Sequence, residues 1–273
     1  MCLIAFAWCA HPRYRLVLAG NRDEFHERPT EPLAPWLSEP SRLLAGRDLE
    51  CGGTWLGVAE PDRACVVTNV RDPHASQDRR SRGLLVLDYL RGAAPAREHA
   101  AQLVTAAADY RPFNLLLFDR DTACYVTNHP QPAWKPMFPG VFALSNGSLD
   151  DSWPKARRLC AALTEWIEER DAGADALFAP LADETRAPEA ELPDTGVGIE
   201  RERLLSPAFI RGECYGTRAS TLVTITHGGA GEIIERRFGP NGVAQGESAF
   251  RFSALPTRRQ DPRVARAAAA GVV

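Results

Sequence analysis

Short apolar runs separated by polar turns dominate the first 70 residues. Residues 3–8 and 14–19 are two such runs on either side of His11 and Pro12, a pattern that predicts a β-hairpin. Residues 54–58 and 64–69 are also rich in β-branched side chains and predict two more strands. The prolines between residues 29 and 40 predict an extended loop. We therefore expect four strands in this part of the chain.

Apolar residues at helical spacing come next, in residues 81–90 and 95–108. The strongest helical pattern covers residues 151–169, where Leu159, Leu163 and Trp166 share one face. Ser152 is the expected N-cap, and Pro154 suits the first turn. The acidic, proline-rich stretch 171–207 predicts a short helix and a surface loop.

Further strands are expected at six places, residues 114–119, 123–128, 140–145, 219–227, 232–238 and 247–253. Strands, then helices, then strands again are typical of an α+β fold, with two antiparallel sheets and helices on the outside. No linker-like composition interrupts the chain. We expect one domain over residues 1–254, followed by a flexible or helical tail over 255–273.

The charge and hydropathy of the chain exclude some classes of protein. A formal net charge of -3 and a pI of about 6.1 argue against a protein that binds nucleic-acid backbones, which usually presents a basic face. No apolar run approaches the roughly 20 residues of a membrane-spanning helix. The first apolar stretch lacks the basic residues that precede the core of a signal peptide. We expect a soluble, cytoplasmic protein without an integral membrane segment.

Cys2 is the first candidate for chemistry. The chain has 7 cysteines at wide spacing and no C-x-x-C pair, so structural zinc or a redox dithiol is not expected. Removal of Met1 would give Cys2 a free α-amine. Such an amine titrates near 7.7–8.0 and a thiol near 8.5, so the amine can take the proton of the thiol and activate it. Position alone does not distinguish this role from chance.

The polar block Asn21-Arg22-Asp23-Glu24 follows the second expected strand, which we expect to end at Gly20. An antiparallel partner brings this block back beside Cys2. Asp23 can then bind the α-ammonium, and Arg22 can hold a thiolate or a substrate carboxylate. The competing interpretation is an ordinary polar turn.

Three further polar residues are candidates because of their position next to expected strands. Asn69 and Asn146 lie at strand ends, where an amide can bind an oxyanion or orient an amine. Asn is also a common turn residue. Arg218 comes just before the expected strand at 219–227, where it can point into a pocket or pair with a surface carboxylate.

Taken together, seven sequence blocks resemble the Transport and Golgi organisation 2 family, also called NRDE proteins. The resemblance runs from residue 1 to about 238 and rests on MCLIAFAW, AGNRDEFHERPTEP, AGRDLECGGTWLGV, VVTNVRD, SRGLLV, ALSNG and YGTRASTLV. That family in turn is similar to the choloylglycine-hydrolase and penicillin-V-acylase branch of N-terminal-nucleophile (Ntn) hydrolases. The resemblance implies a four-layer αββα sandwich.

The same resemblance implies roles for individual residues. Cys2 corresponds to the nucleophile, with its own amine as base, and Asp23 to the residue that steadies the amine. Asn69 and Asn146 are the counterparts of the two amides that form the oxyanion hole and orient the nucleophile, and Arg218 of a supporting arginine. In the expected reaction, Asn146 and a backbone N–H near Asn69 hold the oxyanion. One position departs from the branch, which has an arginine where this chain has Gly20. Arg22 is the alternative source of that charge, and strand alternation is expected to aim it differently.

Two functions are expected. The first is hydrolysis of a C–N amide or related acyl bond of a small molecule, without a cofactor. The second is a non-catalytic carrier of haem or an acyl lipid, because members of the family are associated with Golgi organisation, lipid or acyl-CoA balance and haem movement. Axial haem ligands would come from His11, His26, His74 or Cys2. A purely scaffolding role leaves the cluster of polar residues unexplained. The sequence predicts no oligomeric state.

Overall fold

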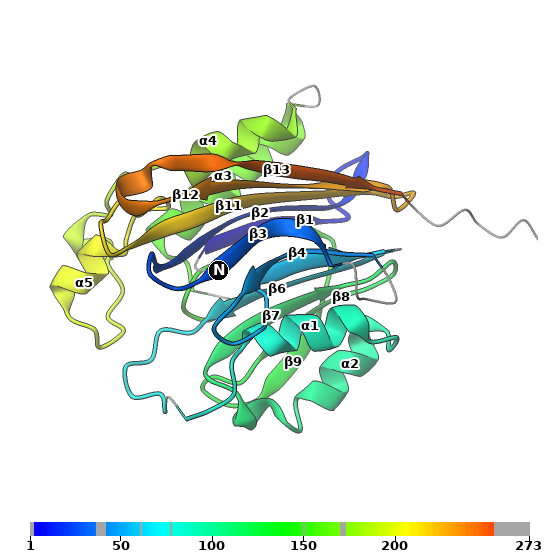
Figure 1. The fold of residues 1–273 in the computed structure, drawn as a ribbon, viewed down its shortest axis with the longest axis horizontal. Coiled ribbons are helices and arrows are strands. Elements are labelled where there is room, and N and C mark those ends of the chain that lie inside the picture. Colours follow the sequence, from blue (N-terminus) through cyan, green and yellow to red (C-terminus); the bar gives the residue numbers. More distant parts are fainter. Residues whose placement is uncertain are drawn as a thin grey trace, which may run out of the picture.

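The computed structural model describes residues 3–36, 42–60, 62–76, 78–149, 151–169 and 173–253. Two antiparallel sheets stack face to face, and helices cover both outer surfaces (Figure 1). The first sheet has the order β10 (Gly140–Leu144), β1 (Leu3–Trp8), β2 (Tyr14–Phe25), β11 (Tyr215–Thr226), β12 (Gly231–Phe238) and β13 (Ala244–Phe252). The second has the order β3 (Thr30–Trp36), β4 (Leu43–Asp48), β5 (Leu56–Ala59), β6 (Arg63–Asn69), β7 (Phe113–Phe118), β8 (Ala123–Thr127) and β9 (Ala133–Met137).

The helices complete four layers. α3 (Pro154–Glu168) and α4 (Phe178–Leu181) pack on the first sheet, and α1 (Gly83–Arg91) and α2 (Ala96–Leu103) pack on the second. The remaining short segments are α5 (Ile199–Leu204) and the 3₁₀ turns η1 (Ala107–Asp109), η2 (Ala174–Leu177), η3 (Glu189–Glu191) and η4 (Pro240–Gly242). This arrangement confirms the expected αββα sandwich of α+β class.

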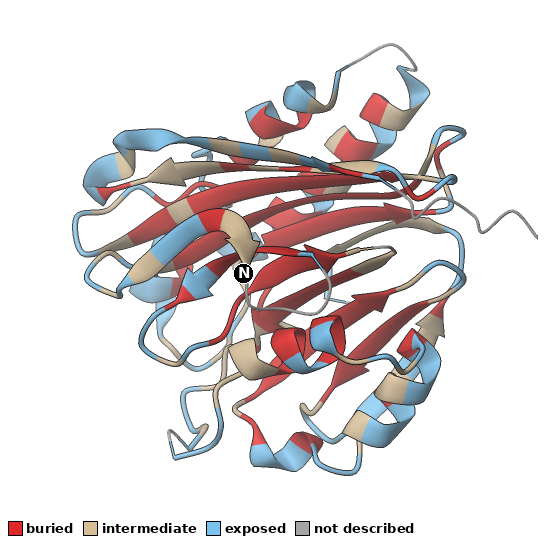
Figure 2. Ribbon diagram, turned by 45° about the vertical axis from the view of Figure 1, so that its right-hand side comes forward, coloured by how far each residue is buried: buried red, intermediate tan, exposed pale blue. Residues whose placement is uncertain are grey.

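Strand alternation divides the buried side chains among three apolar layers. Most strands of both sheets are buried along much of their length (Figure 2). Phe6 and Leu18 belong to the layer between the sheets, where Phe118 also lies. Leu3 and Val17, at odd positions on the same two strands, pack against α3 and α4. Successive side chains point to opposite faces of a strand, so each residue of β2 is assigned to one of these two layers.

The first 70 residues contain six strands in their described part, not the expected four. β3 and β4 were not anticipated as strands. β3 lies at the edge of its sheet, and its pairing with β4 is irregular between Glu31 and Ala34, around Pro32. Proline is tolerated at a sheet edge and at irregular pairings because its missing N–H need not join a ladder. β9, another edge strand with a proline, was missed for the same reason.

Several expected boundaries are also corrected. Helix α3 begins at Pro154 with Trp153 as its N-cap, and no side chain caps it, so the expected cap by Ser152 is wrong. The stretch 171–207 contains short helical turns, of which α5 is the longest in its described part. β2 does not end at Gly20 but continues to Phe25, because β11 pairs with it from Tyr215 onward. Residues 254–273 lie outside the described residues.

The turn between β1 and β2 lies at the opposite end of the molecule from the NRDE block. Cys9 adopts a positive φ of 47°, and its N–H donates to the Arg15 carbonyl at 2.7 Å. The ring Nδ1 of His11 accepts the N–H groups of Arg13 and Tyr14 at 3.0 and 3.2 Å. These bonds fix the length of the hairpin and therefore the register Leu3↔Asn21.

In the part of the chain that the structure describes, no helix is long and apolar enough to cross a membrane.

Candidate functional site

The NRDE block presents its side chains to two sides of β2. Arg22 stacks on Trp55, which belongs to the layer between the sheets together with Leu16 and Leu18. Positions two apart on a strand share a face, so the Arg22 side chain lies on the face of β2 to which a side chain at position 20 would point. The expectation that alternation aims Arg22 differently from Gly20 is therefore wrong.

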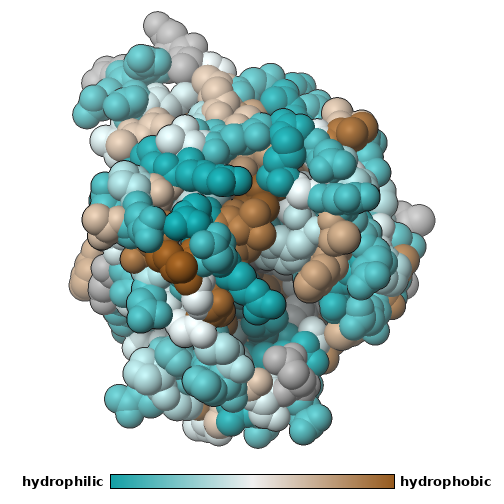
Figure 3. Space-filling model, turned by 90° about the vertical axis from the view of Figure 1, so that its left-hand side faces the viewer, coloured by the Kyte–Doolittle hydropathy of each residue, from teal (hydrophilic) through white to brown (hydrophobic). Residues whose placement is uncertain are grey.

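A polar pocket opens at the end of the molecule where β2 ends and α1 begins. It encloses about 660 Å³ of empty space, part of it open to solvent. Figure 3 views this end, where hydrophilic side chains and a few strongly apolar ones surround a hollow. The residues that line the pocket are Arg22, Asp23, Glu24, Arg28, Asp48, Thr54, Trp55, Val67, Asn69, Ser81, Arg82, Gly83 and Arg111.

Asp23 is held in place by the neighbouring strand. Its exposed fraction is 5%, and its Oδ1 accepts a hydrogen bond from Thr217 Oγ1 at 2.7 Å. The same hydroxyl accepts the N–H of Ile210 at 2.9 Å. A carboxylate anchored through one oxygen in this way keeps a fixed orientation at the pocket wall.

Arg22 is a buried cation with a distant counter-charge. Its exposed fraction is 5%, its guanidinium lies 4.3 Å from the Trp55 ring centroid, and its Nη2 is 3.9 Å from Glu24 Oε2. Burial lowers the pKa of Arg22, and the Glu24 carboxylate opposes that effect. Arginine nevertheless stays charged in proteins, so the pocket carries a desolvated positive charge.

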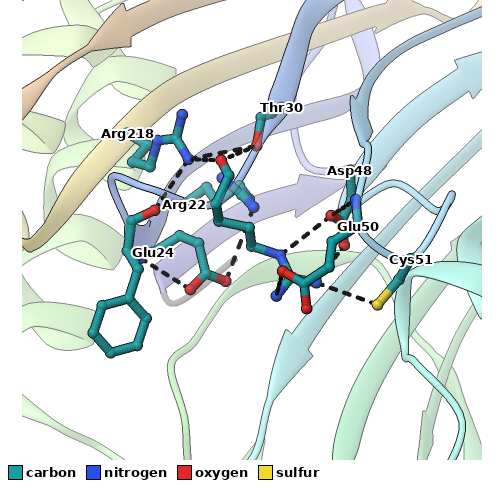
Figure 4. Close-up of polar contacts among 9 residues, drawn as sticks. Arg22, Glu24, Thr30, Asp48, Glu50, Cys51 and Arg218 are labelled. Atoms are coloured by element: carbon teal, nitrogen blue, oxygen red, sulfur yellow. Dashed lines mark hydrogen bonds and ion pairs between the residues drawn. The ribbon is translucent and has the colours of Figure 1, made fainter.

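Arg28 belongs to a compact ion-pair network on the outer side of the pocket (Figure 4). Its Nη2 and Nε bind the two carboxylate oxygens of Asp48 at 2.7 and 3.2 Å, and its Nη1 lies 3.0 Å from Glu50. Nη2 also donates to Cys51 Sγ at 3.4 Å. Burial would lower the pKa of Arg28, but the hydrogen bonds and charge of Asp48 outweigh it and raise the pKa.

Asn69 and Asn146 come together, although the sequence separates them by 77 positions. The Asn146 amide nitrogen donates to both the backbone oxygen and the side-chain Oδ1 of Asn69, each at 3.0 Å. Asn69 lines the pocket with Arg22 and Asp23, whereas Asn146 lines a neighbouring surface hollow. Asn146 is thus placed to orient Asn69.

Arg218 lies in β11 at a register shift between Thr217 and Ala219. It lines an adjacent hollow with about 900 Å³ of empty space, part of it open to solvent, and Arg22 and Trp55 line both this hollow and the first pocket. Its Nη1 donates to the carbonyl oxygens of Arg28 and Phe25 at 2.5 and 3.1 Å (Figure 4). Burial lowers the pKa of Arg218, and the charge of Glu24 opposes that effect. Arg218 thus holds the chain that follows β2.

Cys2 lies outside the described residues. The first described residue, Leu3, pairs with Asn21, so the start of β1 is beside the NRDE block. Asn21 itself faces the helices and has a structural role, because its amide nitrogen donates to the carbonyls of Leu181 and Ala208.

The histidines named as haem ligands are dispersed. His11 belongs to the distant hairpin turn, and His74 lies in an exposed loop. Burial lowers the pKa of His26, which lies just after the NRDE block. None of the three lines the pocket. In the described ranges, no group of three or more His, Cys, Asp or Glu side chains could hold a metal.

Several residues of the site were not singled out from the sequence, above all the pocket residues Trp55, Arg82 and Arg111 and the Asp23 partner Thr217. Trp55, Thr217 and Arg82 fall inside the blocks GGTW, YGTR and SRG, which carry the family resemblance. Those blocks were the signal that could have identified them. Arg111 lies outside every such block and gives no comparable signal.

The family model of Transport and Golgi organisation 2 matches residues 1–240. The chain belongs to that family. The human Transport and Golgi organization protein 2 homolog is 32% identical over 259 residues, which covers 86% of this chain and 92% of the human protein. The mouse homolog is 31% identical over 256 residues, with the same coverage.

Solved structures similar to this family member are Ntn-hydrolase-like. A C2A mutant of the conjugated bile acid hydrolase from Clostridium perfringens superposes with a TM-score of 0.51 at 9% identity, covering 92% of each chain. The N-acylethanolamine-hydrolyzing acid amidase ortholog of Caenorhabditis elegans has a TM-score of 0.48 at 12% identity, over 81% of this chain and 92% of its own. At such low identity, the likeness to the bile acid hydrolase shows the fold alone.

Proposed function

We propose that the protein is an N-terminal-cysteine hydrolase that cleaves a C–N amide or related acyl bond of a small molecule. The observation that carries the proposal is the register Leu3↔Asn21, because Cys2 is bonded directly to Leu3 and consecutive Cα atoms are about 3.8 Å apart. An N-terminal residue is therefore tethered next to the NRDE block. The Ntn-hydrolase-like fold supports the same proposal.

The proposed reaction needs no group beyond this chain and water. After loss of Met1, the α-amine of Cys2 takes the thiol proton, and the thiolate attacks the substrate carbonyl carbon. The resulting ammonium returns the proton to the leaving nitrogen as the C–N bond breaks. Water then hydrolyses the thioester, releasing the acid and restoring the thiol. Asp23, anchored by Thr217, binds the ammonium form of the amine.

Asn69 is the proposed side-chain donor to the oxyanion, with Asn146 as its positioning residue. This differs from the sequence-based expectation, in which Asn146 is the donor. The Asn146 amide nitrogen is directed to Asn69, and Asn69 lines the pocket. Loss of one oxyanion donor lowers kcat by about 10²–10³.

The first test is the chemical state of the amino terminus. Intact mass of the protein from its own host is measured, followed by limited labelling with iodoacetamide and peptide mapping. We expect loss of Met1 and fastest labelling at Cys2, abolished in Cys2→Ser and unchanged in the control Cys9→Ser, whose thiol is exposed on the distant turn. Retention of Met1, or labelling of Cys2 no faster than the exposed Cys9 and Cys214, overturns the proposal.

The second test separates the two asparagines, on any amide that the wild type hydrolyses. Asn69→Ala is expected to lower kcat by about 10²–10³ with little change in KM. Asn146→Ala is expected to lower kcat less and also to lower the unfolding midpoint, because it removes two hydrogen bonds to Asn69. An unchanged kcat in Asn69→Ala removes the oxyanion role from that residue.

A further inference from the structure

Glu235 is a buried carboxyl group with one oxygen that the fold leaves unused. Its exposed fraction is 2%, and its Oε1 accepts the N–H of Leu33 at 2.8 Å, where β3 pairs irregularly with β4. Arg237 Nη1 lies 4.0 Å from the same Oε1. Among the described residues, none donates a hydrogen bond to Oε2. A buried acceptor without a donor is costly, so Oε2 points to a donor on a bound molecule.

The Glu235 side chain lines the hollow that adjoins the pocket. This space, the Glu235 hollow, shares Arg22 and Trp55 with the pocket. The Trp55 ring is fixed against the backbone of β4, because a Cβ on Gly46 would collide with it. The stacked pair of Arg22 and Trp55 is therefore a common wall, and a substrate held in the pocket can extend past it into the Glu235 hollow.

Ionisation of Glu235 is opposed by burial and favoured by nearby charges. Burial raises the pKa of this carboxyl, and the charges of Arg237 and Arg22 act in the opposite direction. An N–H that donates to Oε2 would favour the carboxylate in the same way as these charges. A ligand donor at this place thus reduces the cost of burying Glu235.

Arg218 offers donors to the same hollow. It is the extra residue at the register shift between Thr217 and Ala219, and such a bulge re-aims a side chain. Its Nη1 binds the carbonyl oxygens of Phe25 and Arg28, whereas its Nε and Nη2 donate to no residue in the described ranges. Figure 4 shows the other terminal nitrogen directed away from these carbonyls. Arg218 is thus fixed through one nitrogen and can donate with the others.

The charges of the Glu235 hollow are of both signs. The charged side chains that line it are Arg22, Arg218, Arg237, Glu31 and Glu235. Arg22 is ion-paired with Glu24 on the pocket side at 3.9 Å. A carboxylate ligand is repelled by Glu235, and an ammonium ligand is repelled by Arg218. A neutral carboxamide presents both an N–H and a carbonyl oxygen, and can therefore bind both groups.

We infer that the Glu235 hollow binds a second carboxamide of the substrate, one that is not cleaved. Glu235 Oε2 accepts its N–H, and Arg218 donates to its carbonyl oxygen. The inference rests on the proposed hydrolase function and names its substrate class, small molecules with two amide groups. A site built to bind an N–H discriminates strongly against an analogue without it, because the buried acceptor is then unpaired.

The test compares ligands of matched chain length that differ at the second polar group. On the acyl side, 4-acetamidobutanoyl-4-nitroanilide is compared with heptanoyl-, 6-aminohexanoyl- and pimeloyl-4-nitroanilide, which end in methyl, ammonium and carboxylate groups. On the amine side, N-(3-acetamidopropyl)pentanamide is compared with N-hexylpentanamide, N-(5-aminopentyl)pentanamide and 6-(pentanoylamino)hexanoate. Binding is measured by calorimetry on Cys2→Ala, and turnover on the wild type. We expect the acetamido ligand of at least one series to bind about tenfold tighter or more than each of its matches.

Variants assign this preference to Glu235. In Glu235→Gln, the side-chain oxygen stays with the Leu33 N–H and an NH2 group replaces Oε2, so the ligand N–H meets a donor. In the Cys2→Ala background, this variant should lose most of the preference, whereas Glu232→Gln should keep it. Glu232 lies on the same strand, pairs with Arg251 at 3.0 Å and does not line the hollow, so it matches the change in charge.

N-methylation of the preferred acetamido ligand is the matching change on the ligand. It removes the N–H and should weaken binding to Cys2→Ala about tenfold or more. It should have little further effect in Glu235→Gln, because both changes remove the same bond. If Glu235→Gln does not fold, Gln245→Trp narrows the hollow from an exposed position, and the exposed neighbour Ala244, outside the lining, gives the control Ala244→Trp.

Three outcomes overturn the inference. They are acetamido ligands that bind no more tightly than their matches in both series, a preference that survives in the folded hollow variant, and a preference that N-methylation leaves unchanged. The outcomes also separate this inference from the proposed function. Preferred binding of an acetamido ligand without turnover by the wild type contradicts the hydrolase but keeps the carboxamide site. Turnover without that preference does the reverse.

Discussion

Replacement of Asn21 by alanine tests whether the first residue of the NRDE block stabilises the fold. Asn21 is 0% exposed, its amide nitrogen donates to Leu181 and Ala208 at 2.8 and 2.7 Å, and its Oδ1 accepts from Ser220 at 2.7 Å. Alanine removes all three hydrogen bonds and leaves the carbonyls of Leu181 and Ala208 and the hydroxyl of Ser220 buried without their Asn21 partner. At about 1 kcal/mol per bond, we expect Asn21→Ala to reduce the free energy of unfolding by about 3 kcal/mol.

Thermal unfolding followed by circular dichroism measures this loss. For a domain of this size, about 2–4 °C per kcal/mol gives a decrease in Tm of about 6–12 °C. Ser220→Ala is the matched control, because it removes only one of the three bonds and should cost about 1 kcal/mol. The double variant should cost less than the sum, since the two residues share that bond.

Two results would refute the reasoning. One is a free energy of unfolding for Asn21→Ala within about 0.5 kcal/mol of the wild type. The other is a loss in Ser220→Ala as large as that in Asn21→Ala, which would show that the bonds to Leu181 and Ala208 contribute little.

Two further predictions concern Glu235 and Gly53. Burial raises the pKa of the Glu235 carboxyl, so its contribution to stability is present below the unfolded pKa of about 4.3 and is lost as pH rises through the folded pKa. In urea unfolding, the free energy of unfolding of Glu235→Gln should rise relative to that of the wild type as the pH increases from about 4 to 8. A relative decrease over this pH range contradicts the prediction. Gly53→Ala places a Cβ against the Gly83 backbone and should cost about 1–3 kcal/mol in the same assay. It should cost more than Gly52→Ala, where the space is open and only the positive φ is strained, and equal losses would argue against the close contact.

The sequence was sufficient to predict the bounds of strands whose hydrophobic pattern is local. β1, β6 and β7 alternate or run apolar between clear turn signals, and their bounds were found to within a residue. β3 was missed because its prolines argue against a strand, and only its edge position makes them acceptable. The end of β2 was placed too early because Arg22 and Asp23 resemble a turn, while pairing with β11 keeps them extended.

The candidate site was predictable as a set of residues but not as an arrangement. Asp23 and Asn69 line one pocket, as their positions near strand ends indicated. Arg218 lies in the adjacent hollow, because the irregular pairing after Thr217 cannot be read from local sequence. That Asn146 donates to Asn69 also depends on contact between strands of different sheets.

The hairpin turn at the far end of the molecule decides which side chains reach the pocket. A strand exchanges its two faces when its register shifts by one residue. An insertion or deletion of a single residue between Cys9 and Arg13 would therefore direct Asn21 and Asp23 between the sheets and Arg22 toward the helices. The turn length is as much a determinant of the chemistry as the NRDE block itself, although no atom of the turn lines the pocket.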